Sequence, residues 1–88
     1  MPGWYVYLLR CGDGTLYAGV TTDVEARLAA HRAGKGARYT RGRGPLDLVH
    51  CEFHQDRSAA LRRERELKAL RRVEKLALLR AGRRRAPA

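Results

Sequence analysis

The chain has 88 residues, with 19 Lys or Arg against 9 Asp or Glu, so its formal net charge at pH 7 is +10. Hydrophobic residues make up 44% and charged residues 32% of the sequence, a balance typical of a globular domain and not of a disordered or fibrous chain. The excess of basic residues favours an anionic partner. Nucleic acid is the first candidate, because clustered Lys and Arg release counterions from its phosphates.

No apolar run approaches the roughly 20 residues that span a bilayer, and no signal-type segment begins the sequence. We therefore expect a cytoplasmic protein without a membrane partner. The two cysteines, Cys11 and Cys51, are too few for a disulfide scaffold and are expected to be small buried thiols.

The N-terminal stretch predicts a β-hairpin. Residues 4–11 and 15–20 are rich in aromatic and β-branched residues, and they flank a Gly-Asp-Gly turn sequence. The loop length sets which side chains share a face, because successive side chains of a strand point to opposite faces.

Two loop lengths are open for this hairpin. A two-residue loop would put Tyr7 and Tyr17 on opposite faces. A three-residue loop pairs Tyr7 with Gly19 and brings Tyr5, Tyr7 and Tyr17 to one face, leaving an apolar set on the other face for helices to cover. We favour the three-residue loop, which commonly carries a glycine in the left-handed conformation.

A helix is expected next, from residue 23 to about residue 33, ending at the following glycine. Thr22 is its expected N-cap, and Glu25 would complete a capping box. Arg27 and His31 are four residues apart, so they form one ridge beside the buried side of this helix, where they can face a cleft.

The rest of the chain predicts a basic loop, a strand and two helices. Residues 34–45 contain four glycines, four basic residues and a proline, so we expect no regular structure there. A third strand is predicted for residues 46–53, a helix capped by aspartate for residues 57–70, and a last helix for residues 73–81. Residues 82–88 are expected to form a basic, flexible tail.

The element order is therefore β-β-α-β-α-α. It predicts an α+β fold in which a small, mostly antiparallel three-stranded sheet is flanked by helices. Since no internal repeat or linker divides the chain, residues 1–81 should form a single domain.

Glu64 is the acidic residue that the helical pattern singles out. It falls on the same side of the predicted helix as Ala60, Leu61 and Leu67, whereas Glu66 should point to solvent. A carboxylate within an apolar stripe is costly to bury unless it is paired or bound to a cation. The pattern alone leaves open a simple salt bridge to a neighbouring arginine.

Two tyrosine motifs, YVY at residues 5–7 and YAG at residues 17–19, lie in the predicted hairpin. Three further residues follow them in order: Arg27, His31 and Glu64. This set resembles the GIY-YIG nuclease family, and the flanking sequences resemble its small, single-domain bacterial members of the UPF0213 type. The likeness covers about residues 4–79. Tyr5 replaces the usual Gly and Ala18 the usual Ile or Val, but neither position supplies the family's chemistry.

The resemblance implies a metal-dependent endonuclease that hydrolyses phosphodiester bonds, in DNA first and in RNA as an alternative. Glu64 would hold one Mg²⁺ or Mn²⁺ ion on a phosphate oxygen. Arg27 would neutralise charge on the phosphoryl group. Tyr7, with Tyr17, would activate the attacking water, and His31 would relay a proton or hold the phosphate.

Other residues are expected to assist around this centre. Tyr5 is the last of the catalytic candidates. Phosphate contacts are expected from the basic residues of the loop and of the following helix: Lys35, Arg38, Arg41, Arg43, Arg62, Arg63 and Arg65. A protein partner or a homodimer is compatible with so small a module, and the family suggests a role in DNA repair or recombination.

Two other functions remain open. A non-catalytic DNA- or RNA-binding module would share the charge and the basic loop, but it has no need of a lone inward carboxylate that repels phosphate. A zinc site could be sought in Cys51 and His54 together with Cys11 or His50. Strand alternation puts His50 and Cys51 on opposite faces, and no second CxxC-type pair exists, which argues against zinc.

Overall fold

Three strands and three helices make up the part of the chain that this computed structural model describes, residues 3–81. They follow the predicted order and are β1 (Trp4–Arg10), β2 (Leu16–Thr21), α1 (Val24–Arg32), β3 (Asp47–His54), α2 (Arg57–Ala69) and α3 (Arg72–Ala81). None of these helices is long and apolar enough to cross a membrane. The tail predicted for residues 82–88 lies outside the described residues.

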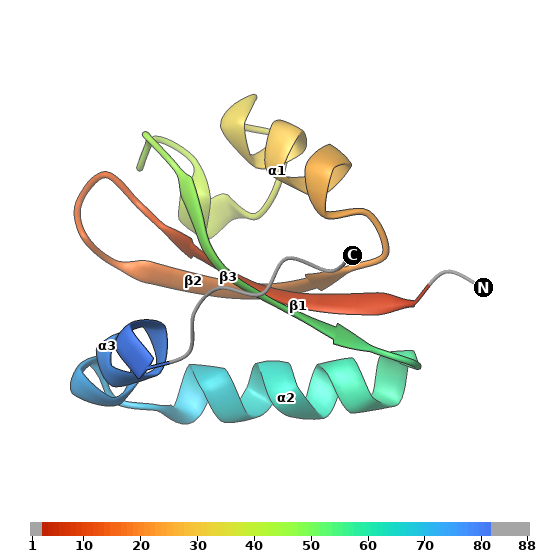
Figure 1. The fold of residues 1–88 in the computed structure, drawn as a ribbon. Helices are drawn as coiled ribbons and strands as arrows, with labels where there is room; N and C mark the ends of the chain where they lie inside the picture. The colour runs from red at the N-terminus through yellow and green to blue at the C-terminus, as the bar shows by residue number, and fades with distance from the viewer. Residues whose placement is uncertain (1–2, 82–88) are drawn as a thin grey trace.

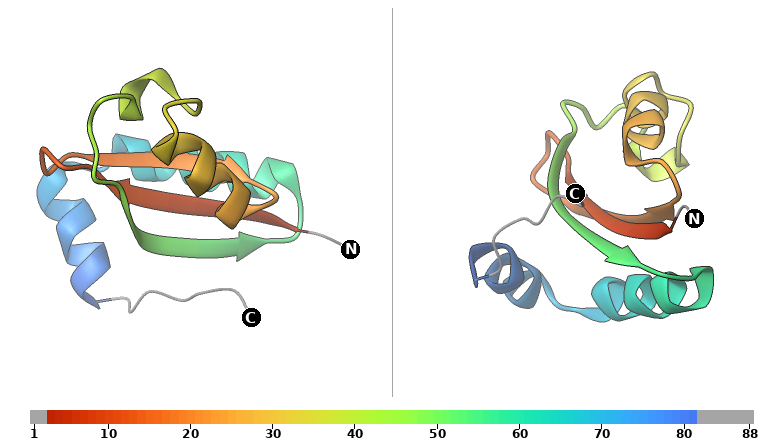
Figure 2. Two further views of the ribbon diagram at one scale, coloured as in Figure 1. Left: turned by 90° about the horizontal axis from the view of Figure 1, so that it is seen from above. Right: turned by 45° about the vertical axis from the view of Figure 1, so that its right-hand side comes forward.

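The sheet has the order β2-β1-β3, and both pairs of neighbouring strands are antiparallel. α1 covers one face of the sheet, and α2 and α3 lie on the other (Figure 1). The sheet is strongly twisted, so that the strands curve between these two helical layers (Figure 2). The predicted α+β fold is therefore confirmed, with β1 as the central strand.

The hairpin has the three-residue loop favoured from the sequence. Tyr7 lies opposite Gly19, and Leu9 lies opposite Tyr17. The Cys11 N–H donates to the Thr15 carbonyl oxygen at 2.8 Å, which closes the loop. Gly14, at the end of the loop, has a φ of +87°, the left-handed conformation that glycine adopts most easily.

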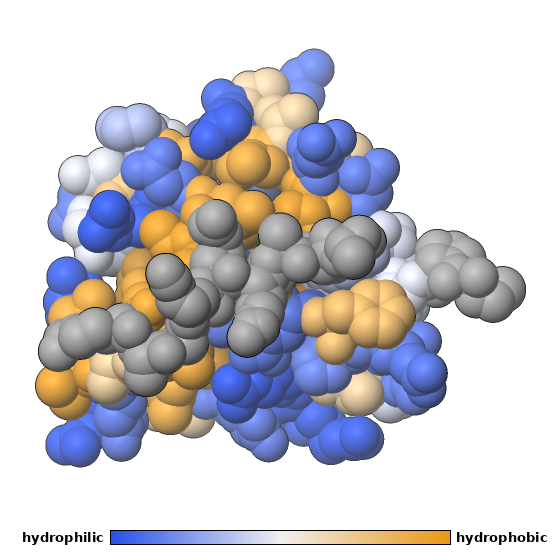
Figure 3. Space-filling view, in the orientation of Figure 1, coloured by the Kyte–Doolittle hydropathy of each residue, from blue (hydrophilic) through white to orange (hydrophobic). Residues whose placement is uncertain are grey.

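This register puts the apolar side chains of the hairpin toward α2 and α3. Val6, Leu8 and Ala18 form a buried core with Ala60 and Leu67 of α2. The face predicted for helix packing is thus confirmed. On the surface shown in Figure 3, hydrophobic residues gather in the middle, between α1 and α2, while hydrophilic residues gather along α2.

The start of α1 differs from the expectation. Asp23, not Thr22, is the N-cap, because its side chain accepts a hydrogen bond from the Ala26 N–H at 3.0 Å. Glu25 is then one position too early to complete a capping box, so that prediction is wrong as well. Thr and Asp both cap helices well, and the local sequence does not separate them. The predicted end is confirmed, since Gly34 has a φ of +79°.

The basic loop is more ordered than its composition suggests. Residues 38–40 form a short 3₁₀ turn, where no regular structure was expected. The Thr40 and Arg41 N–H groups donate to the carbonyl oxygens of Ala37 and Arg38. The turn buries Thr40 to 2% exposure against α1, which supplies the tertiary support that so short a turn needs.

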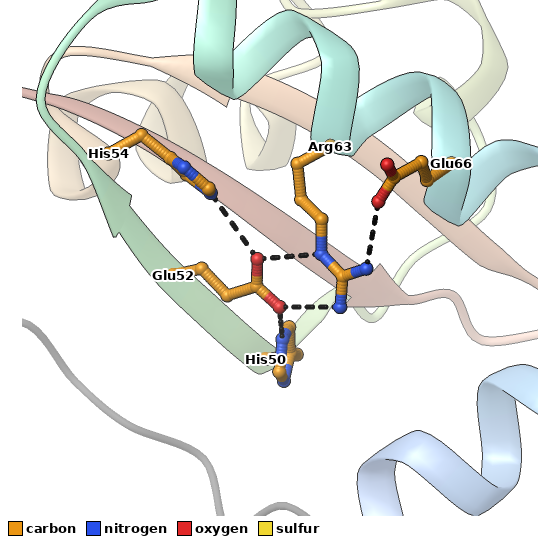
Figure 4. A network of polar contacts seen from close by, with 5 residues as sticks. All are labelled: His50, Glu52, His54, Arg63 and Glu66. Carbon is orange, nitrogen blue, oxygen red and sulfur yellow. Dashed lines mark hydrogen bonds and ion pairs between the residues drawn. The ribbon is translucent and has the colours of Figure 1, made fainter.

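A polar network joins β3 to α2 (Figure 4). The Glu52 carboxylate accepts two hydrogen bonds from the Arg63 guanidinium, at 2.9 and 3.0 Å. His50 and His54, on the same face of β3, contact the same carboxylate at 2.7 and 3.4 Å. Glu66 meets the Arg63 guanidinium at 3.1 Å. Because Arg63 directly precedes Glu64, this network also fixes the part of α2 that carries the predicted metal ligand.

The network predicts a specific loss of stability in acid. Contact with His50, and then with Arg63, lowers the pKa of Glu52 from 4.5 to about 2, against the opposing effect of burial. The ionised carboxylate therefore stabilises the fold above pH 4.5, and that contribution is lost as the pH falls toward 2. We expect Glu52→Gln to lower the free energy of unfolding at neutral pH by about 2 to 3 kcal/mol. Urea titrations across this pH range measure it.

Glu66→Gln is the matched control for that experiment. The Glu66 side chain is 65% exposed and contacts the same Arg63. Its loss should cost less than about 1 kcal/mol. Equal losses in the two variants, or an unchanged acid transition in Glu52→Gln, would contradict the role given to Glu52.

Candidate active site

Three aromatic rings from three elements meet on the α1 face of the sheet. Tyr7 of β1 and His31 of α1 are 2% and 1% exposed, and the Tyr7 hydroxyl lies 2.9 Å from Nε2 of His31. The ring of Tyr17, on β2, is centred 6.5 Å from Tyr7 and 5.4 Å from His31. The hairpin register therefore delivers Tyr7 and Tyr17 to one cluster, and α1 completes it.

Gly19 makes room for this cluster. It lies opposite Tyr7 in the sheet, and a Cβ atom at this position would overlap the Tyr7 hydroxyl and ring. Gly19, the glycine of the second tyrosine motif, is thus needed because the Tyr7 side chain passes directly over it.

Gly19→Ala is expected to destabilise the protein. An alanine in a strand normally stabilises relative to glycine, so a loss identifies the clash with Tyr7. We expect the free energy of unfolding to fall by about 1 to 3 kcal/mol, as measured by denaturant titration followed by circular dichroism. Gly44→Ala is the control, because a Cβ there meets no atom within 4 Å. A Gly19→Ala protein as stable as the wild type would refute this packing.

The basic loop fixes the protonation of His31. The Ala37 N–H donates to Nδ1 of His31 at 3.3 Å, and the Thr40 hydroxyl lies 2.9 Å from the same nitrogen. A nitrogen that accepts a hydrogen bond carries no proton, so the proton of the neutral ring is on Nε2. The Nε2–H group therefore donates to the Tyr7 oxygen. Burial, and then the charge of Arg27, lower the pKa of His31 and keep the ring neutral.

This environment of His31 predicts a second pH dependence. In the unfolded chain the His31 imidazole becomes protonated below about pH 6.5. In the folded protein its pKa is lower, so the ring stays neutral at a pH where the unfolded chain is already protonated. The contribution of His31 to stability is therefore complete above pH 6.5 and falls as the pH drops below it. Urea titrations between pH 5 and 7.5 should show a shallower pH dependence in His31→Gln than in the wild type. Parallel pH profiles of the two proteins would be inconsistent with a buried neutral ring.

Arg27 and Glu64 act on the same phenol from two different helices. Burial raises the pKa of Tyr7, and the charges of Tyr17 and Glu64 raise it further. The Arg27 side chain lowers this pKa, but less than the other effects raise it. Glu64 is on α2, and its side chain is 18% exposed. The structure therefore brings together five of the predicted site residues: Tyr7, Tyr17, Arg27, His31 and Glu64.

Tyr5 lies apart from this cluster. Its ring packs edge-on against Phe53 at 5.5 Å. It also lines a separate cavity of about 370 Å³, beside the start of α1 and β3. It shares the face of Tyr7 but not its contacts, and a catalytic role for it stays a prediction.

The predicted phosphate-binding residues fall into two groups. Arg63 and Arg43 have carboxylate partners, Glu52 and Asp13 respectively. The others are exposed on the loop and on α2: Lys35, Arg38, Arg41, Arg62 and Arg65. The exposed group is free to meet phosphates, whereas Arg63 is held by the network that positions α2.

Tyr39 is a residue that the sequence interpretation missed. Its ring stacks on Tyr17 with centroids 5.7 Å apart and an interplanar angle of 25°, and it is 40% exposed. The signal was available, because Tyr39 is the single aromatic residue of the basic loop. Only the fold shows that the loop brings it onto a candidate catalytic tyrosine.

Glu64 is the one member of the cluster that suits a hard metal ion. Its partner is Lys68, whose Nζ lies at 3.5 Å in an ion pair one helical turn away. Within residues 3–81 no group of three or more His, Cys, Asp or Glu side chains is arranged to hold a metal. An ion here would take one carboxylate, water and substrate oxygens, the mixture that Mg²⁺ commonly accepts. Glu64 therefore fits the ion that the resemblance implies.

Comparison with known proteins identifies the family of this chain. A family model of the GIY-YIG catalytic domain matches residues 3–77. The chain belongs to the GIY-YIG family. Members of this family are in general endonucleases that act on nucleic acid, so the fold is of a nuclease type.

Its relatives include several UPF0213 proteins. One from Natronomonas pharaonis is 58% identical over 71 residues, which cover 81% of this chain and 84% of the relative. One from Staphylococcus haemolyticus is 51% identical over 79 residues, covering 90% and 96%. The solution NMR structure of a UPF0213 protein from Bacillus halodurans has a TM-score of 0.59 at 47% identity, covering 89% of this chain and 83% of that one.

Proposed function

We propose that this protein is a divalent-metal-dependent endonuclease that hydrolyses phosphodiester bonds in nucleic acid, with DNA as the first candidate substrate. The observation that carries the proposal is the meeting of buried Tyr7 and His31 with half-buried Tyr17 in one cluster, which Arg27 and Glu64 influence electrostatically. The net charge of +10 supports a polyanionic substrate. Such a substrate agrees with the cytoplasmic location expected from the sequence.

In this proposal Glu64 holds one Mg²⁺ or Mn²⁺ ion. When bound, the ion would polarise the scissile phosphate and stabilise the leaving oxygen. The Arg27 guanidinium would neutralise the charge that develops on the phosphoryl oxygens. Lys68, whose exposed side chain pairs with Glu64 at 3.5 Å, would release the carboxylate when the ion arrives.

Tyr7 is the proposed base. Burial raises its pKa, so the phenol first has to lose its proton to solvent, and the phenolate oxygen can then accept a proton from the attacking water. Two donors favour the anionic oxygen, since the Nε2–H of His31 points at it and Arg27 lies close by. Tyr17, packed beside both rings, would position the water.

Glu64→Ala and Arg27→Ala provide the test of catalysis. Labelled single strands, duplexes, flaps and junctions of DNA, with matching RNAs, are incubated with Mg²⁺ or Mn²⁺ and resolved by electrophoresis. The wild type should cleave at least one of them. Both variants should lose at least about 100-fold in rate, because each removes a charge from the reaction centre. Binding and the circular dichroism spectrum should be retained.

Glu66→Ala is the matched control, since it removes a carboxylate from the same helix two residues away, on a side chain that is 65% exposed. It should cleave at close to the wild-type rate. Full activity in Glu64→Ala would overturn the assignment. Binding without cleavage of any substrate by the wild type would instead identify a non-catalytic nucleic-acid-binding module.

A further inference from the structure

The exposed ring of Tyr39 forms the outer end of a row of aromatic side chains that leads to the candidate base. Tyr39 stacks on Tyr17 at 5.7 Å, Tyr17 contacts His31 at 5.4 Å, and His31 contacts Tyr7 at 5.9 Å. A planar group stacked on Tyr39 would therefore be separated from Tyr17, a proposed catalytic residue, only by the Tyr39 ring. In a nucleic acid, the planar group that could stack there is a nucleobase.

The planar guanidinium group of Arg43 already lies over the Tyr39 ring. The Arg43 guanidinium lies 4.4 Å from the ring centroid, and its Nη1 pairs with Asp13 of the hairpin loop at 2.6 Å. The side chains of this pair are 40% and 42% exposed, so solvent screens it and it holds weakly. A phosphate offers the same guanidinium a stronger, bidentate partner, and Arg43 can then leave the ring.

The surroundings of Tyr39 carry the charge that a nucleic acid needs. Lys35, Arg38 and Arg41 lie on the same loop and are exposed. Alternation of a stacking ring with basic side chains is typical of surfaces that bind single strands. Bases within a duplex are stacked on both faces, so a ring fixed in a loop reaches a base face only where the strands are unpaired.

We infer that Tyr39 is a stacking platform for an unpaired nucleobase, and that Arg43 exchanges Asp13 for a backbone phosphate when the strand binds. The inference rests on the proposed function and deepens it: the substrate is a nucleic acid with a single-stranded segment at the cleavage site. Tyr39 selects this class by stacking, a contact that tolerates any base sequence.

Metal-free binding tests the platform without requiring turnover. Fluorescence anisotropy in EDTA compares a short oligothymidine strand with a blunt-ended DNA duplex. Tyr39→Leu should weaken single-strand binding by about tenfold or more, since one stacked base is lost, and should leave duplex binding within about twofold. Tyr39→Phe keeps the ring and should bind like the wild type.

Arg41→Gln is the control for charge. Arg41 is exposed on the same loop, two residues from Tyr39. Its loss should weaken the binding of single strand and duplex alike and reduce the salt dependence by about one ion. A loss restricted to single strands is thus the signature of the ring and not of the charge.

A 2-aminopurine base in the single strand reports stacking directly. Its fluorescence should be quenched by the wild type and by Tyr39→Phe, and not by Tyr39→Leu. Equal weakening of single strand and duplex by Tyr39→Leu, or quenching that survives in it, would overturn the inference. Glu64→Ala should keep the preference for single strands, so a failure of catalysis and a failure of the platform are separate outcomes.

Discussion

The register of the β1–β2 hairpin is the constraint on which the rest of the structure depends. A three-residue loop places Tyr7 opposite Gly19, and the absence of a side chain at Gly19 lets the phenol cross the neighbouring strand. The same register sends Val6 and Leu8 toward α2. A slip of one residue would exchange the two faces, burying the phenols in the core and exposing the apolar set. The cluster and the core are therefore specified together.

Two helices contribute to the candidate site from opposite sides of the sheet. α1 is held by its Asp23 cap and by the contacts of His31 with Tyr7 and the basic loop. α2 is held by apolar packing and by the bidentate pair of Glu52 with Arg63, directly beside Glu64. In this arrangement the charge of a carboxylate in one helical layer adds to the raised pKa of a phenol that faces the other layer.

In the free protein the proposed reactive groups form hydrogen bonds and ion pairs with other side chains of the chain. Tyr7 is a buried phenol that accepts from a neutral His31, Glu64 pairs with Lys68, and Arg43 pairs with Asp13 over Tyr39. The Arg43–Asp13 pair is exposed on both sides, so it costs little to exchange. A phosphate backbone and a divalent ion would offer stronger partners to Arg43 and Glu64. The proposed function requires Glu64 to exchange Lys68 for a metal ion, and the inference about Tyr39 requires Arg43 to exchange Asp13 for a phosphate.

The sequence determined the element order and the inward side of α2, and it favoured the hairpin register that the structure has, because turns, helix caps and periodicity depend on residues close together in the chain. The tertiary structure decided the partner of Arg63, the protonated nitrogen of His31 and the position of Tyr39 on Tyr17. Each of these depends on a contact between distant segments, such as Glu52 with Arg63 or Tyr17 with Tyr39. Even the N-cap of α1 was chosen between two adjacent residues of similar propensity by the geometry of the folded chain. Local pattern cannot encode such contacts, since they form only when the sheet and helices are packed.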